Sequence, residues 1–304
     1  MEYPLEEILE KTKKIVLESG TYIKEAFETR EVINKTLEIK DNNCSDLVTE
    51  VDKKVEKTLK EKLKSLYPDF LFVGEETVAA SGSKKTGLTD APTWVIDPVD
   101  GTTNFVHGFP FVCISVALVI KKIPVLGIIY NPILNNFYWG IKGKGSFVDG
   151  KKLPLIKNTP LKSLKESLII TEYGADRRID SIENKLNNIK NIISNPVHAI
   201  RSLGSAAMNM CYVARGGADF YYEIGIHAWD VAAAVVILRE AGGAVVNWQR
   251  DKDLDKNVLV VNEGYDILKR HVLCIRGVIE GKEHQSKLLE EFREKLIDFP
   301  AESD

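Results

Sequence analysis

The feature that most constrains the fold is a change of hydrophobic periodicity near residue 70. Before it, apolar residues recur at helical spacing through residues 5–27 and 51–66, which predicts two long amphipathic helices. After it, short runs rich in β-branched and aromatic residues follow one another with turn residues between them. These runs span residues 70–74, 93–97, 112–120 and 125–131. A hairpin pattern around Gly143 and Gly145 continues them, so the middle of the chain is expected to form an antiparallel or mixed sheet.

The second half alternates between the two periodicities. Strand-like segments are residues 167–172, 218–223 and 257–262, and helical segments are 182–193, 205–217 and 229–243. Strands and helices in unequal blocks favour a layered α/β sandwich over a regular doubly wound sheet. We expect one domain over residues 1–281. The charged tail, residues 282–304, is expected to add a surface helix outside the core.

Composition narrows the function classes. The 304 residues are 44% hydrophobic and 28% charged, with a net charge of -3. This charge offers no basic surface for a nucleic acid, and no apolar run is long enough to cross a membrane. The start of the chain lacks the apolar core of a signal peptide, and four scattered cysteines suit a reducing compartment. We therefore expect a cytoplasmic protein.

Acidic residues mark the ends of three separate elements. Glu75 and Glu76 follow one apolar strand, Asp97 and Asp100 follow another, and Asp230 opens a very apolar helix. Carboxylates at the margin of a core are costly unless basic residues, backbone donors or a cation compensate them. Neither histidine nor cysteine stands at metal-ligand spacing near them, so an all-oxygen ligand set would suit magnesium rather than zinc.

The turn that follows the second strand could hold an anion. Gly101 permits close approach of backbone, and the amides of Gly101 and Thr102 can form an anion-binding nest. Carboxylates for cations beside amides for an anion describe a site for a metal-bridged phosphate. Taken singly, each acid also fits a simpler role, as a turn former or as an acid at a helix N-terminus.

Three separated segments resemble the signatures of the inositol monophosphatase family. They are GEETVAA, WVIDPVDGTTNFVHGFP and GIHAWDVAAAVVILREAGG, beginning at residues 74, 94 and 225. DLVTEVD, HAIRSLGSAA and GGADFYYE fit the same pattern, and the likeness extends from the first helix to about residue 273. The resemblance implies an α+β fold, a layered αβαβα sandwich of the sugar-phosphatase type. It also implies a homodimer, dependence on magnesium and inhibition by lithium.

The resemblance also implies roles for individual residues. The metal ligands would be Glu75, Asp97, the carbonyl of Val99, Asp100 and Asp230, holding two or three Mg²⁺ ions. Glu75 and Thr102 would orient the attacking water, Asp97 would bridge two ions, and the amides of Gly101 and Thr102 would hold the phosphate. Substrate contacts would therefore include Glu75, Val99, Asp100, Gly101, Thr102 and Asp230, and on the inositol side Gly204, Ser205, Ala206 and Glu223.

Three further positions are noted, and one of them departs from the family pattern. Ala175 replaces a serine that many relatives carry near the substrate, which affects one polar contact and no catalytic role. Lys40 and Asp52 lie in a segment that resembles the family's mobile loop, and they are given little weight as site residues.

The expected activity is the magnesium-dependent hydrolysis of myo-inositol 1-phosphate by an activated water. One alternative is a related phosphatase that acts on a sugar bisphosphate or a nucleotide 3'-phosphate. Another is a haloacid dehalogenase type of phosphatase, but Pro98 and Val99 separate the two aspartates where that type has a single residue. A catalytically silent metal-binding scaffold is the third.

Overall fold

The structure is a computed structural model that describes residues 3–29, 38–39, 47–81, 87–156, 160–195, 197–248 and 265–301. The strand expected at residues 257–262 lies outside these ranges, and so does Lys40. The helices in the described ranges are too short or too polar to cross a bilayer.

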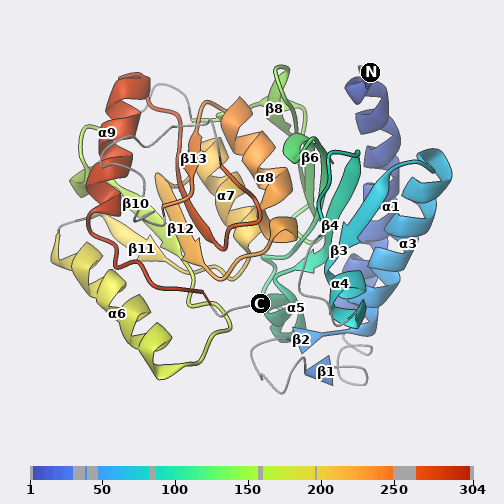
Figure 1. Cartoon of the computed structure of the whole chain (residues 1–304), viewed down its shortest axis with the longest axis horizontal. Coiled ribbons are helices and arrows are strands. Elements are labelled where there is room, and N and C mark those ends of the chain that lie inside the picture. Colours follow the sequence, from blue (N-terminus) through green and yellow to red (C-terminus); the bar gives the residue numbers. More distant parts are fainter. Residues whose placement is uncertain are drawn as a thin grey trace.

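Two helices form the first layer, as the helical periodicity predicts. They are α1 (Leu5–Thr29) and α3 (Glu50–Leu66), which lie side by side in Figure 1. Thr49 and Asp52 form a capping box that starts α3, and Pro68 follows its end. Between the two helices in the chain, β1 (Glu38–Ile39) and β2 (Leu47–Val48) pair antiparallel.

The second layer is a seven-stranded sheet with the order β3-β4-β5-β6-β7-β8-β9. Its strands are β3 (Leu71–Gly74), β4 (Thr93–Asp100), β5 (Cys113–Ile120), β6 (Ile123–Asn131), β7 (Asn136–Ile141), β8 (Gly145–Val148) and β9 (Lys151–Lys152). Only the β3–β4 pair of this sheet is parallel. Alternate residues of β4 face opposite layers: Trp94 packs with α1 and α3, whereas Val95 packs with the next helical layer.

The middle layer is the helix pair α7 (Ala206–Arg215) and α8 (Ala228–Glu240), between the two sheets. Helix α8 is buried along almost its whole length, because it contacts α7 on one side and β5 and β6 on another. The approach is close at Gly127 of β6, where an added Cβ atom would lie 2.2 Å from the carbonyl oxygen of Ala233. Glycine is therefore required at that position by packing.

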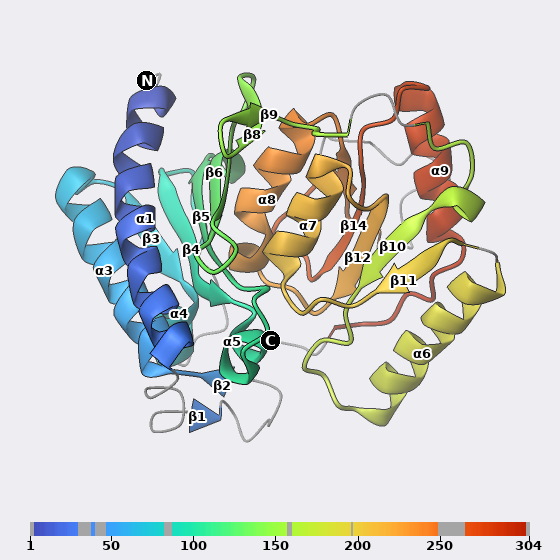
Figure 2. The same ribbon diagram turned by 180° about the vertical axis from the view of Figure 1, so that it is seen from behind.

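The second sheet has the order β11-β10-β12-β14-β13. Its strands are β10 (Leu168–Thr171), β11 (Ala199–Arg201), β12 (Phe220–Ile224), β13 (Ala244–Val246) and β14 (His271–Ile275). The outer helices are α6 (Ile179–Ser194) and α9 (Lys282–Arg293), which Figure 2 shows on the side away from α7 and α8. The layers thus follow the order αβαβα, which confirms the expected fold class.

Several elements were not predicted, and one expectation was wrong. The short helices α4 (Glu75–Ser81) and α5 (Thr102–His107), and the strands β11, β13 and β14, carry no periodic signal that sets them apart. The tail is not an appended surface helix. The apolar face of α9 is buried against the second sheet, where Phe292 is fully enclosed and stacks on Phe220.

Candidate active site

The acidic residues singled out in the sequence gather at one edge of the first sheet. Strands β3 and β4 are parallel neighbours, so their carboxyl ends lie together. Glu75 is the first residue of α4, directly after β3, and Asp97 and Asp100 lie in the last part of β4. Asp230 comes from the middle layer, in the first turn of α8. Elements far apart in sequence thus deliver their carboxylates to one region.

An irregularity in β4 allows two of these acids to face the same region. Residues three apart in a regular strand point to opposite faces of the sheet. The pairing of β4 with β5 shifts between Asp97 and Asp100, where Asp97 is opposite Ser115 and Asp100 is opposite Cys113. Asp97 Oδ1 accepts a hydrogen bond from the Val99 amide at 2.9 Å, which fixes this turn.

Asp100 lies at the N-terminus of α7. Its Oδ2 atom accepts hydrogen bonds from the Ser205 hydroxyl and the Ala207 amide, both at 2.7 Å. Ser205 is the N-cap of α7, and its oxygen also accepts from the Met208 amide at 3.3 Å. The positive end of the helix dipole favours a negative charge here. Asp100 is therefore held by one oxygen while it reaches the other acids.

Asp230 is placed by the start of α8 in a similar way. Its Oδ2 atom accepts a hydrogen bond from the His227 amide at 2.6 Å as part of a capping box. His227 stacks on Trp229 with ring centroids 4.5 Å apart. The turn before α8 is fixed by Arg270, which donates to the carbonyl oxygens of Ile226 and Gly225 at 2.7 and 2.6 Å.

Burial and mutual repulsion raise the pKa values of these acids. Burial is the main cause for Asp97, whose pKa lies well above its usual range, and the charge of Glu75 adds to it. Burial raises the pKa of Asp100 to about 6, and the pKa of Asp230 is raised by burial and by the Asp100 charge. The charge of Arg270 opposes this rise for Asp230, and among the described residues no lysine or arginine forms an ion pair with Asp97 or Asp100. The region therefore holds more negative charge than its neighbours compensate.

This donor set fits a hard divalent cation in chemistry. Its side-chain donors are all carboxylate oxygens, which Mg²⁺ prefers, and the excess negative charge is what a cation would neutralise. Within the described ranges, no three acidic, histidine or cysteine side chains are already arranged as ligands of one ion. Instead, one oxygen of each of these carboxylates accepts a hydrogen bond from a protein group, as described above for Asp97, Asp100 and Asp230.

The expected phosphate nest lies beside the acids, at the start of α5. Gly101 is the N-cap, with φ 91°, and an added Cβ atom would lie 2.9 Å from the Phe111 carbonyl oxygen. The Thr102 hydroxyl lies 2.9 Å from the Val99 carbonyl oxygen and 3.2 Å from Oδ1 of Asp52. Asp52, which had little weight in the sequence-based prediction, is thus in direct contact with a candidate catalytic residue.

The expected inositol-side residues come from two further elements. Gly204, Ser205 and Ala206 form the entry to α7, beside Asp100. Glu223 is half-buried near the end of β12 and accepts a hydrogen bond from the Tyr221 hydroxyl. Burial, followed by the charge of Glu172, raises the pKa of Glu223 well above its usual range.

Three residues that were not predicted from the sequence support the site, because they hydrogen-bond to the backbone of segments that carry its residues. Glu56 of α3 accepts from the Glu76 and Thr77 amides, both at 2.8 Å, and so caps the helix that carries Glu75. Glu172 and Asn104 hold the turn before α7 from opposite sides. Glu172 Oε1 accepts from the Leu203 and Gly204 amides at 2.7 and 2.8 Å. Asn104 donates to the Leu203 carbonyl oxygen at 2.7 Å.

The layers and the cluster of buried acids define a class of protein: a layered α+β sandwich of the sugar-phosphatase type with an acidic site beside helix N-termini. Comparison with known proteins gives the family. The sequence profile described as "Inositol monophosphatase family" matches residues 4–296, so the chain belongs to this family.

Individual relatives agree with this assignment. The chain is 42% identical to inositol monophosphatase 1 of Sus scrofa over 271 residues, which cover 89% of this chain and 90% of that protein. It is 41% identical to the inositol monophosphatase of Mesembryanthemum crystallinum over 255 residues, 82% and 92% of the two chains. Among solved structures, the IMPase of Thermotoga maritima matches with a TM-score of 0.72 at 27% identity, covering 95% of this chain and 99% of that one.

Proposed function

We propose that this protein hydrolyses inositol monophosphates, with myo-inositol 1-phosphate as the expected substrate, in a magnesium-dependent reaction. The observation that carries the proposal is a group of three acids that repel one another, of which Asp97 and Asp100 are buried and Asp230 is partly buried. Asp100 and Asp230 each accept a backbone hydrogen bond at the start of a helix. The relatives named above are inositol monophosphatases, which supports the choice of substrate.

The residues that would hold the metal are Glu75, Asp97, the Val99 carbonyl, Asp100 and Asp230. When bound, two Mg²⁺ ions, with a possible third, would supply charge for water activation and for the leaving oxygen. The chain's own part is to fix positions. The Thr102 hydroxyl, which is held by Val99 and Asp52, would contact the attacking water together with Glu75. The first amides of α5 have no partner within the helix, so Gly101 and Thr102 can donate to phosphate oxygens.

The inositol ring would lie between the α7 entry and β12. Gly204, Ser205 and Ala206 would line one side of the ring, and Glu223 would accept hydrogen bonds from ring hydroxyls on the other. Tyr221 already donates to one Glu223 oxygen, so the side chain has a fixed direction. An acid fixed in this way supports selection of polyols over simple phosphomonoesters.

The decisive experiment is a phosphate-release assay with and without Mg²⁺. The substrates are inositol 1-phosphate, fructose 1,6-bisphosphate and adenosine 3',5'-bisphosphate, and Li⁺ is titrated against the preferred one. We expect magnesium-dependent release that is fastest with inositol 1-phosphate and inhibited by Li⁺. The variant Asp97→Asn should be folded and inactive. Full activity of Asp97→Asn at saturating Mg²⁺ would refute the assignment of the site.

We also infer a homodimer and a cytoplasmic location. Helix α6 buries polar Ser181 and Asn188 but exposes an apolar stripe: Ile179, Ile182, Leu186 and Ile193. Their spacing resembles the seam of paired helices, which supports a second copy as the partner of this face. Light scattering tests this, and Leu186→Glu should shift the protein to a monomer.

The cysteines support the cytoplasmic location. The thiols of Cys113, Cys211 and Cys274 are buried and free, which suits a reducing compartment, and cell fractionation can test this.

A further inference from the structure

The chain segment after α9 runs along the inner face of α6. Asn188 binds the Ile297 backbone in both directions, with its Nδ2 atom donating to the carbonyl oxygen at 3.1 Å and its Oδ1 accepting from the amide at 2.5 Å. One turn further along α6, Asn191 donates to the Lys295 carbonyl oxygen at 3.2 Å. Residue numbers rise along the segment as they fall along α6, so the two run antiparallel. We call residues 295–300 the C-terminal strap.

The strap is anchored in the core of the second sheet. Leu296 and Phe299 are each 6% exposed and belong to the cluster under α9. His271 of β14 donates from Nε2 to the Phe299 carbonyl oxygen at 2.9 Å. A segment held at both its side chains and its backbone has one defined position. Pro300, the last residue of the strap, therefore has a defined position.

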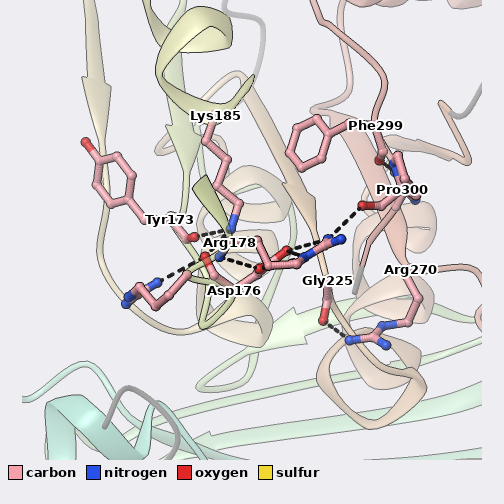
Figure 3. A network of polar contacts seen from close by, with 10 residues as sticks. Tyr173, Asp176, Arg178, Lys185, Gly225, Arg270, Phe299 and Pro300 are labelled. Carbon is pink, nitrogen blue, oxygen red and sulfur yellow. Dashed lines mark hydrogen bonds and ion pairs between the residues drawn. The ribbon is translucent and has the colours of Figure 1, made fainter. Parts of the chain in front are cut away.

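Pro300 meets the loop that follows β10 (Figure 3). Arg178 donates from Nη2 to the Pro300 carbonyl oxygen at 3.3 Å. The same guanidinium binds Asp176 through two atoms, Nε to Oδ1 at 3.1 Å and Nη2 to Oδ2 at 2.8 Å. Two-atom contacts of this kind fix direction as well as distance. Arg178 thus connects the strap to residues 173–178, which we call the substrate-side loop.

The substrate-side loop lies against the residue expected to read the inositol ring. A Cβ atom added at Gly174 would be 3.9 Å from Glu223 Oε1 and 3.6 Å from the Ile224 carbonyl oxygen. Lys185 of α6 holds the loop by donating to the Tyr173 carbonyl oxygen at 2.5 Å. Ala175 offers no polar side-chain atom, so at this position the loop can meet the substrate only with its backbone.

We propose that the C-terminal strap is a specificity-determining element, which positions the substrate-side loop beside Glu223 through Arg178 and Asp176. This inference rests on the proposed function for its effect on catalysis, but not for its effect on the loop. Arg178 and Asp176 are positioning residues, because they act on the substrate only through the loop. Asn188 is a positioning residue one step further away, because it holds the strap.

The test compares the unaltered protein with Arg178→Ala, Asp176→Asn, their double variant and Asn188→Ala. The control is Lys295→Ala, which removes a cation from the other end of the strap, where its ammonium contacts only Asn195 at 3.3 Å among the described side chains. Hydrogen exchange of residues 172–178 is measured by mass spectrometry. kcat and KM are measured with Mg²⁺ for inositol 1-phosphate and for glycerol 2-phosphate, which lacks the ring.

We expect faster exchange of the loop in Arg178→Ala, Asp176→Asn and Asn188→Ala, and no change in Lys295→Ala. KM for inositol 1-phosphate should rise roughly three- to tenfold, with kcat changed by less than about twofold and glycerol 2-phosphate unaffected. The double variant should match Arg178→Ala, since both changes break one connection.

Two results would overturn the proposal. Unchanged exchange in both Arg178→Ala and Asn188→Ala would show that the strap does not position the loop. Equal losses with both substrates would show a structural role without effect on selectivity. Failure of the proposed function looks different: the unaltered protein would then release no phosphate from any inositol phosphate, and the exchange measurement would still decide whether the strap holds the loop.

Discussion

Replacing Asp100 by asparagine should make the metal-free protein more stable and the enzyme inactive. Asp100 is 8% exposed, and the acids around it leave its charge poorly compensated. Asparagine has nearly the same shape, and its carbonyl oxygen can still accept from the Ser205 hydroxyl and the Ala207 amide, which now bind Oδ2. The substitution therefore removes the charge while it keeps the contacts.

The size of the effect follows from the pKa. Burial raises the pKa of Asp100 from an ordinary 3.8 to about 6. At neutral pH, each unit of this difference costs about 1.4 kcal/mol in the free energy of unfolding, so the charged side chain costs about 3 kcal/mol. An amide accepts hydrogen bonds more weakly than a carboxylate, and this loss offsets part of the increase in the free energy of unfolding. We expect a net stabilisation of about 2 kcal/mol, or roughly 3 °C in Tm for a chain of this size.

The assay is thermal unfolding at pH 7.5, first in chelator and then in a series of Mg²⁺ concentrations. Metal binding to the folded state should raise the Tm of the unaltered protein with concentration, and much less that of Asp100→Asn. Glu61→Gln is the control, because it removes one negative charge from an exposed position on α3. It should leave Tm, its dependence on Mg²⁺ and the activity unchanged.

Either of two results would refute this reasoning. An Asp100→Asn variant that is less stable than the unaltered protein in chelator would show that the charge is compensated. A variant that keeps both the stabilisation by Mg²⁺ and the phosphatase activity would show that Asp100 is not part of a metal site.

Three further predictions follow from other parts of the molecule. Glu223→Ala should weaken selectivity for inositol phosphates more than stabilisation by Mg²⁺, and substrate kinetics showing equal losses against every phosphomonoester would contradict this. Gly127→Ala should lower the free energy of unfolding in urea by about 3 kcal/mol, since its Cβ would collide with the Ala233 backbone, whereas Gly217→Ala, where the space is ordinary, should not. Burial lowers the pKa of His271 below its ordinary 6.5, so the unfolded state takes up a proton first as pH falls. The protein should therefore lose stability between pH 7 and pH 5 relative to His271→Gln, and parallel curves for the two proteins would exclude this role.

Much of the fold could be predicted because its long elements have strong periodicity. The helices α1 and α3 and the strands β4, β5 and β6 appear where the pattern predicts them. The short elements could not be predicted from local periodicity, because tertiary contacts stabilise them. Helix α4, for example, has no buried residue of its own and begins where Glu56, twenty positions earlier, accepts its first amides. No local pattern could indicate that contact.

The tail shows a related limit: its helix was predicted from the sequence, but the burial of that helix was not. The tail was expected to form a helix, and α9 forms there, with Leu288, Leu289 and Phe292 on its buried face. Its high charge suggested a place on the surface, but its apolar stripe is buried against β12 and β14. Composition describes all faces of a helix together, whereas burial depends on the one face that meets a sheet.

The sequence alone determined the chemistry of this protein: acids at the ends of apolar strands, a glycine turn beside them, and motifs that resemble one phosphatase family. Tertiary structure decided which of these groups meet. The irregularity in β4 brings Asp97 and Asp100 to one side, the α7 terminus holds Asp100, and α3 brings Asp52 to Thr102. The reason is physical, since each side chain carries its own charge and donors, but a distance between residues fifty or a hundred positions apart exists only after the layers have packed.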